Sequence, residues 1–493
     1  MDRKRLLADL KKLIDRVEAD LRERAEPRGA WPEFHERLTA EYEKARKAER
    51  TAVTFEEWRG EQIAQKAAAW ILSCVFARFL EDNALVDPPR ISGTGDRLRR
   101  ARDEHELFFR EHPKETDREY LLATFEGIRA LPAGEEIFGP HNAIHLFPGW
   151  LGGDMAGELL AFFQRIDPET GELVHDFTDP EWDTRFLADL YQDLSELAKK
   201  KYALLQTPDF VEAFILDRTL EPAIEEFGLN AAPVKGRGGE ALTGPGFRMI
   251  DPACGPGHFL LGAFDRILDR WQRREPATSV VELVNRALGS VHGVDINPFA
   301  VGIAKFRLLL RAMAACGRRR LADCPNFSLN LACGDSLLHG EGFLHQESLP
   351  LETETGISHW YETEDWDALR RILRIGAYHA VVANPPYITV KDKAVNRACR
   401  VRYPEVCHRQ YSLAMPFMQR IFELTCPDGF TGQITANSFM KREFGKKLVE
   451  EFLPKVDLTH VIDTSGAYIP GHGTPTVILF GRNRKPLGST VRT

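Results

Sequence analysis

Short apolar runs alternate with amphipathic stretches through the second half of this 493-residue chain, and this alternation constrains the fold more than any other feature. The expected strands lie at 247–250, 291–295, 327–332, 378–383, 433–436, 458–462 and 476–480, and two clear helices are expected at 260–270 and 300–313. Strands that alternate with helices form parallel β-α units, so the sequence predicts an open, doubly wound α/β sheet. Ligands of such sheets bind beyond the carboxyl ends of the strands.

The first 200 residues have a helical pattern instead. Leucine and valine recur among many charged residues at spacings of three and four, at Leu6, Leu10, Leu13, Val17 and Leu21. Such a stripe is typical of a helix that packs one face against a core or a partner. A Gly- and Pro-rich stretch at 231–246 is expected to be a linker. We therefore predict an α-helical N-terminal domain at 1–200, an α/β domain at 201–484 and a tail at 485–493.

The composition excludes few functions. Hydrophobic residues make up 43% of the chain and charged residues 28%, as in ordinary globular proteins. The net charge of −8 does not exclude nucleic acid as a partner, because local patches steer association. The eight cysteines form no Cys-x-x-Cys pair, so no metal site is predicted. The N-terminus lacks a signal peptide, and the most apolar stretch, at 67–80, is too short to span a bilayer, so we expect no membrane and a reducing cytoplasm.

A glycine motif follows the expected strand at 247–250, with the sequence Asp-Pro-Ala-Cys-Gly-Pro-Gly from position 251. A glycine turn between a strand and a helix lets backbone N–H groups approach a ligand. The dinucleotide pattern GxGxxG is not met, because Leu260 replaces its third glycine and Asp295 lies 38 residues after Gly257 rather than about 20. The acid Asp251 repels phosphate and favours a cationic amino group, unless it is a turn residue. A nucleoside-like ligand that is positive at one end, with ribose hydroxyls for Asp295, is implied, and S-adenosyl-L-methionine matches this description.

A second motif, Asn-Pro-Pro-Tyr, follows the expected strand at 378–383. Proline fixes its own φ and restricts the residue before it, so Asn384 is expected to be held extended. The Asn384 amide oxygen and the Pro385 carbonyl can accept both hydrogens of an exocyclic amine, while Tyr387 stacks on the ring that carries it. The motif by itself fits a stiffened turn equally well. The glycine motif upstream favours a ligand site.

The order of these motifs, with Asn384 133 residues after Asp251, resembles the N6-adenine DNA methyltransferases, especially type I modification subunits and type IIG-like enzymes. The resemblance covers about residues 200–482. It implies a Rossmann-like sheet that uses S-adenosyl-L-methionine, with the methyltransferase catalytic domain at 201–484. The cofactor-binding residues that we expect are Thr207, Pro208, Asp251, Pro252, Ala253, Cys254, Gly255, Gly257, Phe259, Asp295, Ile296, Asp335 and Ser336.

The resemblance also implies roles for several of these residues. Thr207 and Pro208 would contact the amino-acid end of the cofactor, Asp295 its ribose and Asp335 its adenine. The target adenine is flipped out of double-stranded DNA, and the catalytic residues that hold it and guide its N6 to the methyl group are Asn384, Pro385, Pro386 and Tyr387.

A basic segment follows Tyr387. We expect it to be a loop, interleaved with Tyr403 and Tyr411, that tracks DNA phosphates; the alternative is an ordinary solvated loop. Its expected DNA-binding residues are Lys391, Lys393, Arg397, Arg400 and Arg402. Tyr468 is expected to flank the target base.

Three stretches of the N-terminal half, at 147–150, 177–180 and 191–194, resemble the methyltransferases of BREX type 2 phage-defence systems. This implies a bacterial anti-phage or restriction-modification setting, with other defence subunits as partners. Relatives continue into a target-recognition region where this sequence stops at Thr493, so we expect specificity to come from a partner or from further sequence. Two other hypotheses stay open: a methyltransferase acting on protein glutamine, and a non-catalytic scaffold that binds DNA or cofactor.

Overall fold

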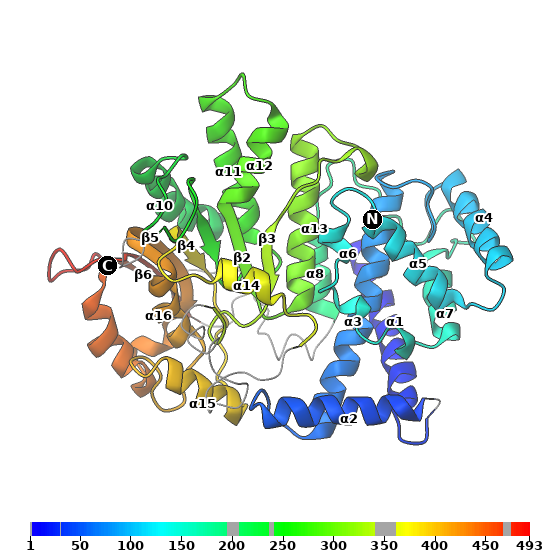
Figure 1. Ribbon diagram of the computed structural model, residues 1–493, viewed down its shortest axis with the longest axis horizontal. Coiled ribbons are helices and arrows are strands. Elements are labelled where there is room, and N and C mark those ends of the chain that lie inside the picture. Colours follow the sequence, from blue (N-terminus) through cyan, green and yellow to red (C-terminus); the bar gives the residue numbers. More distant parts are fainter. Residues whose placement is uncertain (1, 30, 195–206, 236–240, 341–360, 467–474) are drawn as a thin grey trace. The chain divides into compact units, whose positions relative to one another are not determined.

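The computed structural model describes residues 2–29, 31–194, 207–235, 241–340, 361–466 and 475–493 (Figure 1). The chain forms two compact units. Unit 1 comprises Met1–Lys44, Val53–Lys201 and Lys305–Phe327, and unit 2 comprises Ala45–Ala52, Tyr202–Ala304 and Ser328–Thr493. The domain limits of the sequence analysis stay a prediction. The compact units differ from them in two short segments, Ala45–Ala52 and Lys305–Phe327, and unit 2 also includes residues 485–493.

Unit 1 is α-helical, as the sequence predicted. Its elements are α1 (Arg3–Arg24), α2 (Pro32–Lys47, whose last residues belong to unit 2), α3 (Phe55–Asp82), α4 (Asp96–Glu111), α5 (Asp117–Arg129), α6 (Glu135–Phe138), η1 (Ala143–His145), η2 (Pro148–Trp150), α7 (Gly153–Phe163), α8 (Arg185–Leu194) and η3 (Leu321–Asp323). All five residues of the leucine and valine stripe are buried on α1, which packs against α3 and α7. The stripe therefore faces the core.

The central helix of unit 1 is α3. It begins at a capping box, in which Thr54 and Glu57 satisfy each other's backbone N–H groups. The apolar stretch is longer than the sequence predicted: the helix has 28 residues, and among the described residues it is the one helix whose length and hydropathy would suit a membrane span. However, 94% of its most apolar window is buried inside the protein. A helix that is apolar on every side and covered on every side is typical of a core.

Unit 2 is built on a seven-stranded sheet in the order β3-β2-β1-β4-β5-β7-β6. The strands are β1 (Met249–Asp251), β2 (Val291–Asp295), β3 (Asn330–Cys333), β4 (Tyr378–Ala383), β5 (Thr425–Ala436), β6 (Asp457–Asp463) and β7 (Thr476–Arg482). The five strands from β3 to β5 pair in parallel. The prediction of an α/β sheet of Rossmann type is confirmed.

One strand departs from the parallel arrangement: β7 pairs antiparallel with both β5 and β6. A parallel crossover needs a dozen or more residues, usually with a helix. The connection from β6 to β7 spans 464–475, and its described residues hold no helix, so β7 returns directly between β5 and β6.

Helices cover both faces of the sheet (Figure 1). They include α10 (Asp209–Phe227), α11 (His258–Arg274), α12 (Val280–Ser290), α14 (Trp366–Ile372) and α16 (Ala414–Leu424), which contact its strands. Unit 2 also contains α15 (Lys393–Arg402) and the start of α13 (Pro298–Ala315), which continues into unit 1. Successive residues of a strand point to opposite faces. In β2, Gly293 lies against Leu260 of α11, whereas Val294 packs into the cluster that contains Leu369 of α14. The short elements η5 (Asn437–Met440), η6 (Glu443–Gly445), η7 (Leu448–Phe452) and η8 (Leu453–Lys455) connect β5 to β6.

The expected linker at 231–246 is part of unit 2. The backbone N–H of Leu242 donates to the carbonyl of Val234 at 2.8 Å, and both side chains pack with Cys426. The prediction of a linker was wrong, because the buried side chains of Val234 and Leu242 attach this stretch to the α/β unit.

Candidate active site

The glycine motif forms a tight turn after β1. Gly255 and Gly257 have φ of +50° and +86°, a conformation that glycine adopts readily. Asp251 ends β1, and its carboxylate accepts the backbone N–H of Ala253 at 2.9 Å. Asp251 is 2% exposed, and this burial, with a smaller contribution from Asp295, raises the pKa of its carboxyl to about 8. A buried acid therefore lies beside the turn. This fits both interpretations of Asp251, a ligand-binding acid and a turn residue.

Asp295 connects three strand ends. Its carboxylate accepts N–H groups from Gly255 and Asn297, each at 2.9 Å, and its carbonyl accepts the N–H of Gly334 at 2.9 Å. Burial raises the pKa of this carboxyl too. The loops after β1, β2 and β3 are thus hydrogen-bonded to one another. Ile296, the next residue, is 52% exposed beside them.

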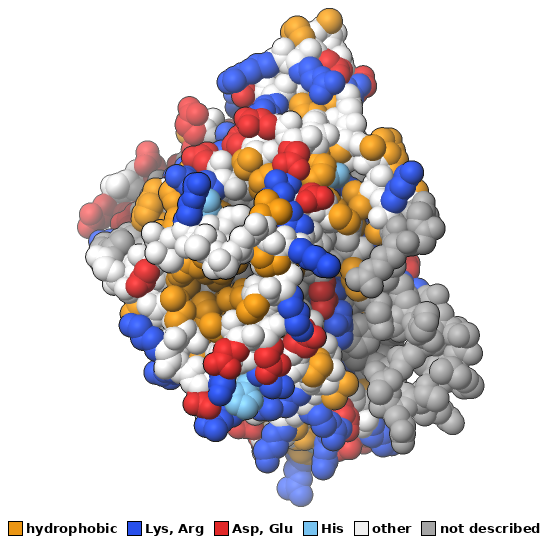
Figure 2. Space-filling view, turned by 90° about the vertical axis from the view of Figure 1, so that its left-hand side faces the viewer, with side chains coloured by type: hydrophobic (Ala, Val, Ile, Leu, Met, Phe, Trp, Pro, Cys, Tyr) orange, Lys and Arg blue, Asp and Glu red, His pale blue; other side chains and the backbone are white. Residues whose placement is uncertain are grey.

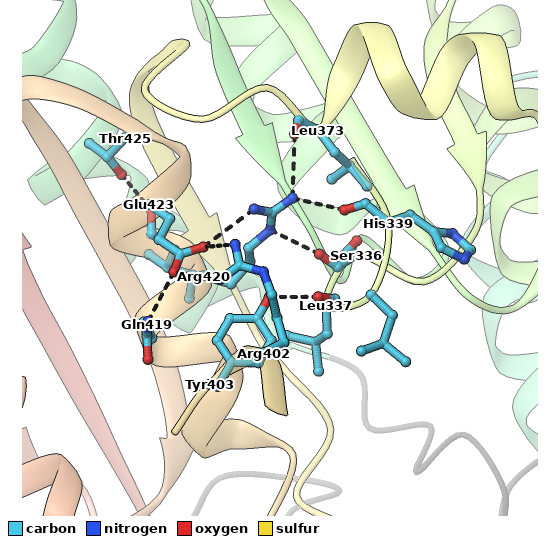
Figure 3. Close-up of polar contacts among 12 residues, drawn as sticks. Ser336, Leu337, His339, Leu373, Arg402, Tyr403, Gln419, Arg420, Glu423 and Thr425 are labelled. Carbon is cyan, nitrogen blue, oxygen red and sulfur yellow. Dashed lines mark hydrogen bonds and ion pairs between the residues drawn. The ribbon is translucent and has the colours of Figure 1, made fainter. Parts of the chain in front are cut away.

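The loop after β3 folds around Asp335. Its carboxylate accepts the N–H groups of Leu337 and Leu338 at 2.9 and 3.1 Å, and burial raises its pKa. Ser336 is buried. Figure 3 shows what holds this loop from behind: Arg420 of α16, 1% exposed, donates to the carbonyls of Ser336 and His339 at 2.9 and 3.0 Å.

The Asn-Pro-Pro-Tyr motif follows β4, which pairs in parallel with β1 through Ile250 and Val381. Asp251 and Asn384 therefore lie at the carboxyl ends of adjacent strands. The Asn384 side-chain NH₂ donates to the Thr207 hydroxyl at 3.1 Å, and the Tyr387 hydroxyl donates to the Asn384 amide oxygen at 2.6 Å. These bonds hold the amide between the two hydroxyls. Burial raises the pKa of Tyr387, so its phenol keeps the donating proton.

The other predicted cofactor residues lie in the same loops. Pro208 precedes α10 and follows Thr207, while Pro252, Ala253 and Cys254 form the turn, and Phe259 begins the buried face of α11. The structure brings Thr207, the glycine motif, Asp295, Asp335 and Asn384 to one edge of the sheet. Tyr468 lies outside the described residues. Within the described residues, no three His, Cys, Asp or Glu side chains gather as they would around a metal ion.

The basic segment is partly a helix rather than the expected loop. Asp392 caps α15, because its carboxylate accepts the N–H groups of Ala394 and Val395. A backbone bridge between Thr389 and Ser412 brings the two ends of the segment together. The segment surrounds a hollow of about 630 Å³, which is lined by Thr389, Val390, Lys391, Lys393, Asn396, Arg397, Arg400, Arg409 and Gln410. Figure 2 shows Lys and Arg side chains gathered along the lower edge of one face, at the height of α15 in Figure 1.

Arg402, Tyr403 and Tyr411, which the sequence analysis placed in the DNA-binding segment, do not line the hollow. Arg402 turns inward and forms an ion pair with Glu423 at 2.8 Å, so it supports α16. Tyr403 and Tyr411 are fully buried in the core, and no base can stack on them. The two tyrosines therefore take no part in the expected phosphate-tracking loop, because the chain after α15 packs them into the core.

Sequence reasoning missed four residues that support the loop after β3: Arg50, His339, Glu364 and Arg420. Arg50 donates to Glu364 at 2.6 Å, and its partners lie about 300 residues away in sequence, 289 for His339 and 314 for Glu364. No local pattern marks such contacts. A charged residue at a helix position that is otherwise apolar, as Arg420 is in α16, was the one available signal.

A seven-stranded sheet of this order, with glycine turn and acids at one edge, defines the fold of class I S-adenosylmethionine-dependent methyltransferases. Residues 289–469 match the Eco57I restriction-modification methylase family. Two solved structures have the same fold at 13% identity: DrdV in complex with DNA, with a TM-score of 0.53 over 98% of this chain and 42% of that one, and the Type ISP restriction-modification enzyme LlaBIII bound to DNA, with 0.52 over 99% and 29%.

The whole of this chain is 48% identical to the adenine-specific methyltransferase PglX of Streptomyces coelicolor, over 520 aligned residues. The chain spans 41% of that protein's length. It is also 27% identical over 225 residues to the type II methyltransferase M.BstVI of Geobacillus stearothermophilus, which covers 44% of this chain and 33% of that one. The resemblance to adenine-specific methyltransferases that the motifs indicated is thereby confirmed.

Proposed function

We propose that the chain carries the catalytic part of a site-specific DNA adenine-N6 methyltransferase that uses S-adenosyl-L-methionine. One observation supports this above all others: Asp251 and Asn384 end adjacent parallel strands, so a cofactor loop and an amine-binding loop share one sheet edge. Ligands of doubly wound sheets bind at that edge. The likeness to PglX favours a phage-defence system of BREX type, or restriction-modification, with other defence subunits as partners.

The donor set fits S-adenosyl-L-methionine. Burial raises the pKa of the Asp251 carboxyl to about 8. A cationic amino group beside it would stabilise its ionised form. Thr207 and the glycine turn would hold the amino-acid end, Asp295 the ribose, and Ile296, Asp335 and Ser336 the adenine. When bound, this cofactor supplies an activated methyl group.

The catalytic role of Asn384 and Pro385 is to hold the target amine. Their oxygens accept its two hydrogens, which leaves the nitrogen lone pair pointing out of the base plane. Thr207 and Tyr387 hold the Asn384 amide in place through hydrogen bonds to its NH₂ and its oxygen. Catalysis is then chiefly positioning in a preorganised polar site.

DNA would bind at the basic hollow. Lys391 and Lys393 carry no carboxylate partner within the described residues, whereas Arg397 pairs with Glu49 and Arg409 with Glu443 at 3.7 Å. Lys391 and Lys393, four and six residues after Tyr387, would contact phosphates beside the flipped adenine. Tyr468 remains a proposed flank of the target base.

Methyl transfer from tritiated S-adenosyl-L-methionine tests the proposal, with cofactor binding measured in parallel by calorimetry. We expect label in adenine N6 of DNA. Asn384→Ala should abolish transfer and leave cofactor binding nearly intact, because its amide serves the amine. Asn483→Ala, which removes an amide that donates to Thr425 at the opposite end of the sheet, is the matched control.

Label in protein rather than DNA would indicate a glutamine methyltransferase. Cofactor binding without any transfer, even to mixed-sequence DNA and with its partners present, would indicate a scaffold. Loss of both binding and transfer in Asn384→Ala would mean that its role is misassigned.

A further inference from the structure

An eight-residue segment, Ala45–Ala52, packs into unit 2 although the chain on either side of it belongs to unit 1. We call this segment the strap. Arg50 contacts the segment that follows β3, and Glu49, Thr51 and Ala52 contact α15 or its capping residue Asp392.

Arg50 connects the strap to the loop after β3. Its guanidinium donates to Glu364 at 2.6 Å, and the pair is buried, with side chains 11% and 4% exposed. It also lies 4.7 Å above the ring of Tyr361. His339, fully buried, is the third member of this cluster.

The protonation of His339 follows from its partners. Its Nδ1 accepts the backbone N–H of Asp335 at 3.1 Å, so Nε2 carries the proton. That N–H faces the Glu364 carboxylate at 4.0 Å, and Arg50, 3.3 Å from Nε2, cannot donate to it. Burial lowers the pKa of His339 to about 3, which keeps the ring neutral. The buried ion pair of Arg50 and Glu364 therefore lies against His339, and His339 accepts the N–H of Asp335.

The next two residues connect the strap to α15. The Thr51 hydroxyl and the Ala52 N–H both donate to one oxygen of Asp392, at 3.0 and 2.8 Å. The other oxygen of Asp392 caps α15 by accepting from Ala394 at 2.8 Å. Glu49 adds an ion pair with Arg397, which lines the basic hollow. One carboxylate is thus shared between the strap and the helix that presents the cations.

We propose that Arg50 is a positioning residue for the Asp335 loop, and that the strap couples cofactor binding to DNA binding. The proposal rests on the proposed function, because it assigns the cofactor adenine to the loop and DNA to the hollow. Arg50 and Thr51 are adjacent in sequence, and their side chains bond to different residues, Glu364 and Asp392. A shift of the loop when adenine binds is transmitted through one peptide unit to the Asp392 cap, and a shift of α15 on DNA is transmitted back. Coupling of this kind is reciprocal.

Calorimetry of S-adenosylhomocysteine, with and without saturating mixed-sequence duplex DNA, measures the coupling. We expect the intact protein to bind it about 5–10-fold tighter with DNA, at the lower end of known coupling factors. Thr51→Val removes one donor to Asp392 while keeping the size of the side chain, and should reduce this factor below about 2-fold. Thr459→Val, which removes a hydrogen bond from β6 to the carbonyl of Phe480 in β7, should leave the factor unchanged.

The role of Arg50 is tested by measuring KM for S-adenosyl-L-methionine and kcat separately. The double variant Arg50→Met with Glu364→Gln removes both charges, so no unpaired ion is buried. We expect it to raise the KM for S-adenosyl-L-methionine about 10-fold with little change in kcat, and Arg50→Lys in the native background to recover most of that loss. A double variant with unchanged KM would overturn the positioning role. The coupling proposal would be overturned if the intact protein and Thr51→Val showed the same coupling factor while methyl transfer to DNA proceeded. Failure of the intact protein to methylate DNA would overturn the proposed function instead.

Discussion

Replacing Arg420 tests the support of the Asp335 loop most directly. Its guanidinium donates to the carbonyls of Ser336, His339 and Leu373 at 2.9, 3.0 and 3.3 Å, and pairs with Glu423 at 3.4 Å (Figure 3). One arm serves both His339 and Leu373, so the network amounts to two strong charge-assisted bonds and two weaker ones. Arg420→Met removes all of them.

The expected loss of unfolding free energy follows from these contacts. Hydrogen bonds to a charged group contribute about 1.5–3 kcal/mol each, so two of them amount to about 3–6 kcal/mol. Removing the charge also removes the cost of burying it, which offsets part of this sum. We expect a net loss of about 3 kcal/mol for Arg420→Met. Arg420→Lys, which keeps the charge but reaches fewer carbonyls, should lose about half as much.

Urea unfolding by circular dichroism measures the loss, and hydrogen exchange of residues 334–339 shows whether the loop opens first. Arg266→Met is the matched control, because its partners Asp217 and Glu221 lie at the surface, where ion pairs contribute about 0–1 kcal/mol. If Arg420→Met cost less than about 1 kcal/mol, with unchanged exchange in the loop, the reasoning would be refuted.

Three further changes test the site. Because burial raises the pKa of Asp251 from 3.8 to about 8, the folded state holds this proton more tightly than the unfolded chain, and stability falls as pH rises through that range; Asp251→Asn should flatten this slope in urea midpoints, and an unchanged slope would contradict it. Tyr387→Phe keeps the ring but loses one hydrogen bond to Asn384, so kcat should fall about 2–10-fold, and no fall would show that the bond does not orient the amide. Gly257→Ala adds a Cβ 3.0 Å from that of Ala304 at φ of +86°, and should weaken cofactor binding in calorimetry; intact affinity would argue against a tight turn.

Much of unit 2 could be predicted because its strands are short apolar runs that end in polar motifs. The limits of β2 and β4 agree with the sequence at both ends, and β1, β3 and β6 differ by one to three residues. The same pattern located Asp251, Asp295, Asp335 and the Asn-Pro-Pro-Tyr motif at one edge, since parallel strands end on the same side.

Other features could not be predicted because they depend on contacts between distant residues. β5 begins at Thr425, eight residues before the predicted start, because its first half gains pairing partners in β4 and β7 rather than an apolar pattern of its own. Arg402 has the sequence pattern of a surface cation, because its ion-pair partner Glu423 lies 21 residues away in sequence. Thr207, predicted by resemblance to contact the cofactor, also bonds to Asn384 177 residues away, which no spacing rule contains.

The bridge between Thr389 and Ser412 has an evolutionary consequence. Because the N–H of Leu413 also donates to the carbonyl of Ile388 at 2.9 Å, the backbone departs from the domain and rejoins it at one point. Between those anchors, Tyr403 and Tyr411 belong to the core, whereas Lys393, Arg397 and Arg400 line the hollow. The charge of the hollow could therefore change during evolution through its lining residues alone, while the core and the neighbouring catalytic motif stayed as they are.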